Sequence, residues 1–351
     1  ALDALIQILE AREDASEIVP LLRQRLEQLG PDDTVARRET WLRLAALCAD
    51  REESAREAID AYREAASIER LSASDELRLA RIHQRLGDEE AFCETFGSWC
   101  DREDAGAVVD DHLEHARALH ARGELGAART RTLRATALAP ESVDAWTLSG
   151  ELAREDGEAS AAAESFARAA EHEPPERAAS LRVLAADCIA RDDPERAHEL
   201  LALALRDDAG SLGVHVALTR TADALSLEEQ TARHAERALE LARAGDLDGA
   251  TRLELALLGG RAAHARSDRP ATRRLFASAL EVDENHIEAL ERVGEADFED
   301  GDRRAAREPL ERRLEQGGEH PDRARHLAMV ARGLEDEDLL DAAWSRYEEA
   351  I

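Results

Sequence analysis

Apolar residues recur at intervals of three and four along nearly the whole chain, on a background rich in Ala, Leu, Arg and Glu. This spacing places them on one face of a helix, whereas a half-buried strand needs strict alternation. Short breakers interrupt the pattern at residues 86–88, 122–124, 156–158, 191–193, 266–268 and 300–302. Glycine in a breaker permits the left-handed conformation that ends a helix, and the acid after it suits the next helix's first turn. The sequence therefore predicts an all-α chain of short helices joined in pairs.

Small residues repeat with a period of 34 or 35 residues. Three such series are Ala116, Gly150 and Ala185; Ala128, Ala162 and Ala197; and Gly260, Gly294 and Ala328. Small residues at a fixed phase let two helices approach closely, while larger residues at neighbouring phases fill the space between hairpins. We therefore expect a repeat array of about ten helical hairpins.

The pattern resembles the tetratricopeptide repeat (TPR). Residues 143–176 match it best, through Trp146, Gly150, Ala162, Phe166, Ala169 and Pro174. Residues 109–142, 178–211, 253–286 and 287–320 match through fewer positions. The resemblance implies an all-α fold, a right-handed α-solenoid of antiparallel helical hairpins (a TPR-like superhelix).

The match to this pattern varies along the chain and predicts four segments. Residues 1–108 are divergent N-terminal TPR-like hairpins, residues 109–211 well-matched repeats, residues 212–252 an irregular helical segment, and residues 253–351 C-terminal TPR-like repeats. Residues 212–252 exceed one repeat in length, so we expect a kink or a change of superhelical pitch there. The absence of an initiator Met suggests an excerpt of a longer protein.

The charge excludes several functions. The formal net charge is −31, and the chain has no lysine, so all 46 cations are arginines. A phosphate-binding P-loop, a Schiff-base enzyme and a protein kinase each need a lysine. The negative charge repels nucleic acid, and no apolar run is long enough to span a membrane. We expect a cytoplasmic, acidic protein that binds neither.

Few residues form a pattern typical of catalysis or metal binding. His112 and His115 share a helix face with Asp111 nearby, but both also occupy positions where the repeat normally packs. The four cysteines are scattered, as expected of small buried apolar residues in a reducing environment. No hydrolase or zinc-protease motif occurs. We expect no catalytic residue, no metal and no cofactor.

In TPR-like superhelices the first helix of each hairpin lines a concave groove. Carried over to this chain, the resemblance gives a partner-binding groove of Asp144, Glu151, Arg154, Glu155, Glu288, Glu291, Glu295, Phe298 and Glu299. The four glutamates from 288 to 299 are either an ordinary solvated face or an acidic stripe that attracts Arg/Lys-rich peptides, with Phe298 as an apolar anchor. TPR domains that clamp a C-terminal carboxylate use lysine and asparagine in the groove. This chain has no lysine, and its single asparagine, Asn285, lies outside the first helix of its repeat, so we do not expect such a clamp.

The sequence thus predicts a noncatalytic protein–protein interaction scaffold that binds a peptide or helix in its concave groove, a basic one if the glutamates form an acidic stripe. The alternative is a regulatory or sensor arm of a larger multidomain signalling enzyme or immune effector. Self-association through the terminal hairpins is a further expectation.

Overall fold

The computed structural model describes residues 2, 5–6, 9, 15–243, 245–316 and 320–351, and within them every regular element is a helix. The chain divides into two compact units, Ala1–Leu152 and Ala153–Ile351. The boundary falls inside one helix, α9 (Val143–Glu155). The predicted segments 1–108, 212–252 and 253–351 each include a few residues outside this description.

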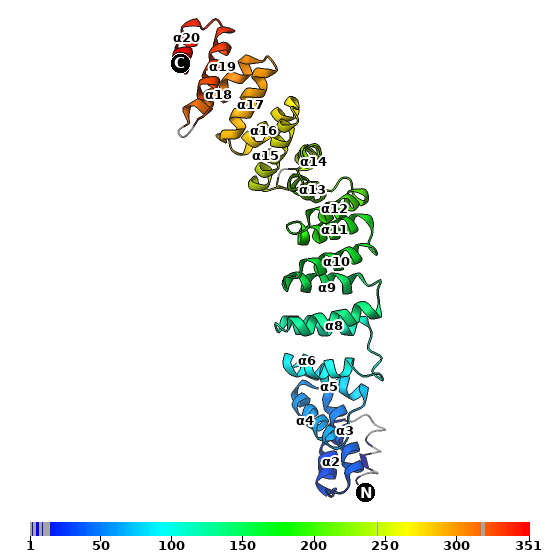
Figure 1. The fold of residues 1–351 in the computed structure, drawn as a ribbon. Coiled ribbons are helices and arrows are strands. Elements are labelled where there is room, and N and C mark those ends of the chain that lie inside the picture. The colour runs from blue at the N-terminus through cyan, green and yellow to red at the C-terminus, as the bar shows by residue number, and fades with distance from the viewer. Residues whose placement is uncertain (1, 3–4, 7–8, 10–14, 244, 317–319) are drawn as a thin grey trace. The chain divides into compact units, whose positions relative to one another are not determined.

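The first unit consists of successive helices joined by short turns (Figure 1). They are α2 (Ala15–Gln28), α3 (Thr34–Ala49), the 3₁₀ turn η1 (Glu52–Ser54), α4 (Ala55–Ile68), α5 (Ala73–Arg85), α6 (Glu89–Cys100), α7 (Val109–Ala121) and α8 (Leu125–Leu138), followed by the first part of α9. Helices α3 and α4, α5 and α6, and α7 and α8 pack as hairpins.

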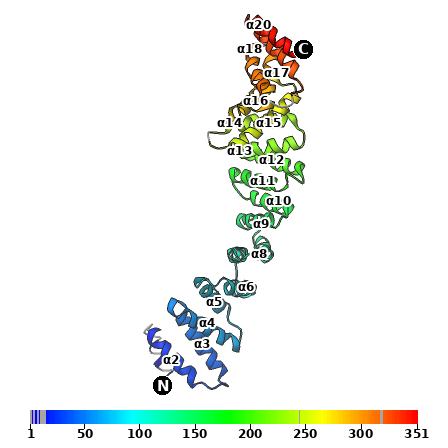
Figure 2. The same cartoon turned by 90° about the vertical axis from the view of Figure 1, so that its left-hand side faces the viewer.

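The second unit continues the same plan, as Figure 2 shows from another side. Its helices are α10 (Ala159–Ala170), α11 (Pro175–Ile189), α12 (Pro194–Asp207), α13 (Leu212–Ala224), α14 (Glu228–Leu241), α15 (Gly249–Ala265), α16 (Arg269–Val282), α17 (Ile287–Glu299), α18 (Arg303–Glu315), α19 (Arg323–Glu335) and α20 (Leu340–Ala350). The first helix of one hairpin also contacts that of the next, as α13 does with α11 and α15. The predicted all-α array of TPR-like helical hairpins is confirmed.

Most turns inside the hairpins contain one residue in the left-handed backbone conformation. Gly87, Gly123, Gly157 and Gly301 have φ between 71° and 89°. Ser226, Ser267 and Asp338 take the same left-handed conformation without being glycine, which costs about 1 kcal/mol each. After several turns an aspartate side chain accepts from a backbone N–H of the next helix, as Asp302 does from Ala305. Five of these left-handed residues lie in breakers that the sequence pattern identified, whereas Ser226 and Asp338 lie outside them.

Close helix approach in the second unit depends on glycines within the hairpins. A Cβ added at Gly294 of α17 would lie 2.5 Å from Cγ of Leu310 on α18, and one at Gly260 of α15 would lie 2.8 Å from the Phe276 ring on α16. Because such distances are far below van der Waals contact, only glycine fits there. Phe276 and Leu310 are fully buried as a result.

The α5–α8 region packs in another way. Phe92, Phe96 and Trp99 of α6 stack along one face of the helix, with ring centroids 5.0 and 5.3 Å apart. His115 of α7 lies edge-on to Phe96, and its ring occupies the space where a side chain on Gly97 would be. Here the glycine lies on the second helix and admits a residue of the following hairpin. This explains why the small-residue phase is lost in residues 73–108.

Within the segment 212–252, α13 and α14 form a hairpin, and the last four residues already belong to α15. Its length beyond one repeat is therefore divided between the stretch after α14 and the first turn of α15. The kink expected there stays a prediction.

Arginine–carboxylate pairs join neighbouring hairpins, between α2 and α4, between α5 and α7, and between α13 and α15. Arg23 and Glu57, and Arg220 and Glu254, are each separated by 34 residues, and Arg81 and Glu114 by 33. In each pair two nitrogen atoms of the guanidinium donate to the two carboxylate oxygens. We call these the repeat-spaced bridges.

No helix among those described is long and apolar enough to cross a bilayer.

Candidate partner-binding face

The predicted acidic stripe lies on α17. Helix α17 begins after His286, whose ring Nδ1 accepts a hydrogen bond from the Ala289 N–H. The helix ends shortly before Gly301, which has a left-handed backbone conformation. Ala289, Leu290, Val293 and Gly294 form the buried stripe of this helix. The 3.6-residue period then places the side chains of Glu288, Glu291, Glu295 and Glu299 together on an adjoining stripe.

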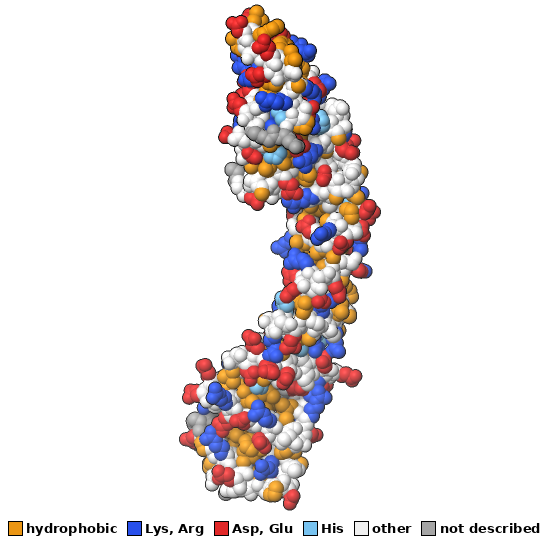
Figure 3. Space-filling model, turned by 60° about the vertical axis from the view of Figure 1, so that its left-hand side comes forward, with side chains coloured by type: hydrophobic (Ala, Val, Ile, Leu, Met, Phe, Trp, Pro, Cys, Tyr) orange, Lys and Arg blue, Asp and Glu red, His pale blue; other side chains and the backbone are white. Residues whose placement is uncertain are grey.

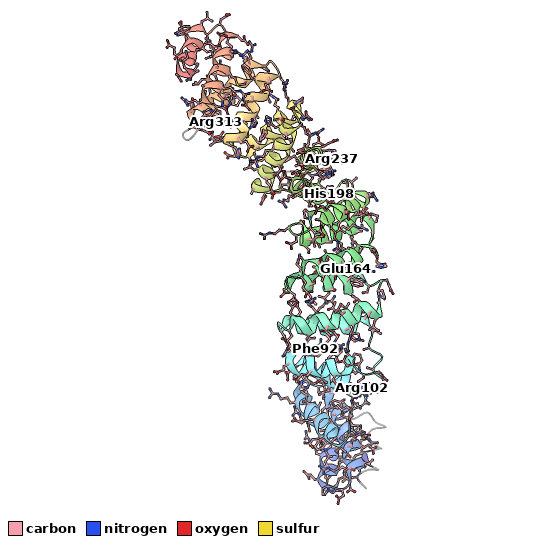
Figure 4. All side chains as sticks on the ribbon, viewed as in Figure 1. Phe92, Arg102, Glu164, His198, Arg237 and Arg313 are labelled. Carbon is pink, nitrogen blue, oxygen red and sulfur yellow. The ribbon has the colours of Figure 1, made fainter. Side chains whose placement is uncertain are left out.

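Three of these carboxylates are paired with arginines of other helices. Glu288 accepts from Arg261 of α15 at 2.6 Å, and Glu291 accepts from the buried Arg313 of α18 at 2.7 Å. Figure 4 labels Arg313 on its helix. Glu299 lies 3.1 Å from Nε of Arg269 on α16. The hydrogen bond from Arg261 lowers the pKa of Glu288. Each negative charge therefore has a positive charge at contact distance.

Glu295 is the most enclosed member of the stripe, with only 6% of the residue exposed. It accepts from Arg292 at 2.8 Å, from Arg325 of α19 at 2.7 Å, and lies 3.2 Å from Nε2 of His326. Burial alone would raise the pKa of Glu295, but the His326 hydrogen bond and the charges of Arg325 and Arg292 outweigh it and lower the pKa to about 2. Glu295 is therefore ionised at neutral pH and is surrounded by two arginines and a histidine.

These pairs change the electrostatic character of the stripe. Four carboxylates that looked like a bare acidic run are neutralised by arginines one helix pair away, such as Arg261 at 27 residues before Glu288 and Arg325 at 30 after Glu295. On the face seen in Figure 3, acidic and basic side chains are correspondingly interspersed. The signal in the sequence would have been an arginine at roughly one repeat length before or after a glutamate of the stripe.

A polar pocket of about 210 Å³ opens beside this stripe, within the second unit. Arg292, Glu295, Ala296 and Glu299 contribute its wall from α17, and Arg325 closes it from α19. The rest of the wall comes from the α15–α16 turn and its surroundings, through His264, Ser267, Arg269 and Thr272. Two of the predicted groove residues, Glu295 and Glu299, are thus brought together in one concavity.

Phe298 is half-buried rather than a free anchor. It packs against the core formed by α18, α19 and α20, and the guanidinium carbon of Arg303 lies 5.8 Å from the centroid of its ring. A partner would therefore meet one edge of this ring.

The other predicted groove residues lie on α9. Asp144, Glu151, Arg154 and Glu155 are all exposed. Their prediction as binding residues stays a prediction, as it does for the α17 residues.

His112 and His115 are buried in α7, in agreement with the packing interpretation, with 5% and 4% of each residue exposed. Burial, reinforced by the charge of Arg131, lowers the pKa of His115 to about 4. Cys48, Cys93 and Cys100 are buried free thiols, and Cys188 is half-buried. Burial raises the pKa of Cys100 to about 12, so its thiol is not a nucleophile at neutral pH.

No protein-family profile matches this sequence, and no curated protein is similar enough in sequence to count as a relative. Solved structures resemble it in fold. The C-terminal part of a TPR repeat-containing protein from Cytophaga hutchinsonii is 12% identical, with a TM-score of 0.48 over 72% of this chain and 99% of that one. YrrB, described as a TPR protein with an unusual peptide-binding site, is 14% identical, with a TM-score of 0.42 over 57% and 97%.

A tetratricopeptide repeat protein from Parabacteroides merdae is 10% identical, with a TM-score of 0.40 over 78% of this chain and 98% of that one. None of these values identifies a relative. The fold assignment rests on the helix pairs, their turns and their spacing in the chain itself.

Proposed function

We propose that this TPR-like array is a noncatalytic protein-interaction scaffold, which binds a peptide or a helix along the face formed by its first helices. The observation that carries the proposal is the polar pocket between α15, α17 and α19. It lies on that face, and its wall offers both carboxylates and guanidiniums, the groups that hold peptide side chains and backbone.

The partner that fits best is a peptide with arginine or lysine residues. The chain carries a net charge of −31, which attracts cations from a distance. Its exposed carboxylates include Asp144 and Glu151 on α9 and Glu299 on α17. Two cations lie near Glu299: Arg269 is 3.1 Å from it, and Arg325 is 3.6 Å from it but donates to Glu295 at 2.7 Å. A partner's arginine would therefore compete with Arg269 for Glu299, while Arg325 keeps Glu295.

The test uses a fluorescently labelled arginine-rich peptide and a glutamate-rich peptide of equal length, measured by anisotropy at low and at physiological salt. The arginine-rich peptide should bind, and Glu299→Arg should weaken it about fivefold, because an exposed charge contributes about 1 kcal/mol. The matched control is Glu308→Arg on α18, an exposed carboxylate on the second helix of the same hairpin. Equal binding of both peptides, or equal loss in both variants, would contradict the proposal.

Self-association remains part of the proposal, supported by the outer face of α20. Leu340 and Trp344 of this helix are 64% and 67% exposed, an unusual amount for such large apolar side chains. A second copy could cover them. Light scattering of the wild type against Trp344→Glu tests this: a mass that does not rise with concentration in the wild type would remove self-association from the proposal.

A further inference from the structure

Three metal-ligating side chains converge in the last two hairpins. Glu291 comes from α17, His320 from the stretch just before α19, and His326 from α19 itself. One ligand atom from each lies within 4.8 Å of the other two. Nε2 of His320 is 2.8 Å from Nδ1 of His326 and 4.0 Å from Oε1 of Glu291. Within the described part of the chain, no other three His, Cys, Asp or Glu residues meet in this way.

Two of the three proposed ligand side chains are already held in place by hydrogen bonds to other residues. Nε2 of His326 faces Oε1 of Glu295 at 3.2 Å, so this nitrogen carries the proton and the lone pair of Nδ1 points towards Nε2 of His320. Glu291 is held by the Nε of Arg313 at 2.7 Å. A ligating histidine that donates its second N–H to a carboxylate, together with a hydrogen-bonded carboxylate ligand, is the usual support of a bound metal ion.

His320 adds a second, independent observation. Its side chain is only 5% exposed, and its Nδ1 is buried without a hydrogen-bond partner. Because Nδ1 has no partner, it can take the proton of Nε2 and leave the Nε2 lone pair to a metal ion.

We propose that Glu291, His320 and His326 bind a divalent transition-metal ion, with Zn²⁺ as the expected occupant. Two imidazole nitrogens and one carboxylate oxygen leave the fourth position of a tetrahedron to water. Ligand atoms on tetrahedral zinc lie roughly 3.3 Å apart, so the two rings must separate by about 0.5 Å and Glu291 must approach. The His320 proton moves from Nε2 to Nδ1 on binding, and no proton is released from either ring.

The ion would tie hairpin α17–α18 to hairpin α19–α20. It would do so close to the beginning of α19, because His320 lies three residues before Arg323, the first residue of that helix. The spacing of ligands in the sequence gave no sign of it: they come from separate elements, whereas the expectation of no metal was based on His112 and His115, which share one helix. This inference does not depend on the proposed peptide binding.

The experiment is a calorimetric titration of the chelator-treated full chain with ZnCl₂, and separately with MgCl₂, followed by thermal unfolding. One Zn²⁺ should bind per chain and raise the Tm, because a ligand that binds only the folded state stabilises it. Mg²⁺ should do neither, since it prefers oxygen ligands. Co²⁺ titrated into the wild type should give the visible ligand-field bands of a tetrahedral site.

The variants His320→Ala and Glu291→Gln should each weaken Zn²⁺ binding more than about tenfold. Circular dichroism checks their folding, and the Co²⁺ spectrum of the wild type gives a readout that needs no variant. The matched control is His234→Ala, which removes one partner of the buried His215–His234 pair, where two Nδ1 atoms lie 3.0 Å apart. It should leave Zn²⁺ binding unchanged. Absence of saturable Zn²⁺ binding in the wild type, or loss in His234→Ala with retention in the other two, would overturn the proposal.

Discussion

The hairpins α5–α8 and α15–α18 both need glycine where helices approach closely, but they place it on opposite partners. In α15 and α17, Gly260 and Gly294 lie on the first helix and receive Phe276 or Leu310 from the second helix of the same hairpin, while Gly259 of α15 meets Ala235 of the preceding hairpin. In α6 the glycine lies on the second helix, as Gly97, and receives His115 from the next hairpin. Both regions use glycine between hairpins, and α15–α18 uses it within hairpins as well.

The two regions also differ in the side chain that packs against the glycine, which is apolar in α15–α18 and titratable in α6–α7. Phe276 and Leu310 have no protonation equilibrium, whereas His115 is a buried base. The contact between α6 and α7 should therefore depend on pH between about 4 and 6.5, whereas the contacts of Phe276 and Leu310 should not. Since repeat arrays need not unfold in a single step, each prediction below is measured by hydrogen exchange of the named helices, in addition to denaturant unfolding.

The largest expected effect is the loss of stability of α6–α7 in acid. The pKa of His115 falls from 6.5 to about 4 on folding, so between these values the unfolded chain binds the proton that the folded one refuses. Stability is full above pH 6.5 and falls as the pH decreases towards 4, by up to about 3 kcal/mol.

His115→Leu should remove most of this dependence in α6–α7, and the remainder is expected from His112 on the same helix, whose pKa burial also lowers. The carboxylate of Asp101 acts in the opposite direction to Arg131 at this site, but it is the weaker influence. The same slope in the variant as in the wild type would show that another group is responsible.

Next in size is Gly294→Ala, which should destabilise α17–α18 by about 2 kcal/mol, because the new methyl group meets Leu310 Cγ at 2.5 Å and the Ala306 carbonyl oxygen at 3.3 Å. The control is Gly213→Ala on α13, where the nearest atom to an added Cβ is the Ser211 hydroxyl at 3.9 Å. That variant should be neutral or more stable, because alanine favours helix. Equal losses in both would remove close packing as the cause.

Gly97→Ala should cost somewhat less, about 1.5 kcal/mol, because its methyl group meets a side-chain ring instead of a tertiary carbon and a backbone oxygen. Gly126→Ala on α8, where nothing lies within 4 Å of an added Cβ, is the control. In a double-mutant cycle His115→Ala should cancel most of the loss, which ties the effect to this contact. Additive losses would contradict it.

The smallest effect concerns the turns. The α5–α6 and α7–α8 turns use Gly87 and Gly123, but the α15–α16 turn uses Ser267 at φ 60°. Ser267→Gly should stabilise α15–α16 by about 0.5 kcal/mol, because relief of backbone strain exceeds the extra entropy that glycine loses on folding. Gly301→Ser at the next turn should destabilise by a similar amount. A loss of stability in Ser267→Gly would indicate that its side chain has a role beyond the turn.

The helices and turns could be predicted from the sequence because they depend on local properties. The breakers at 86–88, 122–124 and 266–268 proved to be hairpin turns, and Gly260 and Gly294 proved to be close-packing positions. Each reflects a short stretch of chain with a fixed period, which one sequence displays directly.

The character of the candidate site could not be predicted in the same way. Glu295 was identified as a groove residue, but its enclosure by Arg292, Arg325 and His326 depends on which residues of the next hairpin face α17. Charge counted along one helix cannot show cations that arrive from another. The same reason hid the His320–His326 contact, since neither histidine belongs to a local motif.

The repeat-spaced bridges have a consequence for how such a chain can change in length. Arg81 with Glu114 and Arg220 with Glu254 join the first helices of successive hairpins and are offset by 33 and 34 residues, so α5 and α13 each present an arginine to the next first helix in the same way. A deletion of whole repeats that joined α5–α6 to α15–α16 would bring Arg81 opposite Glu254. The array could therefore shorten at such a junction and keep a charge pair across the new interface.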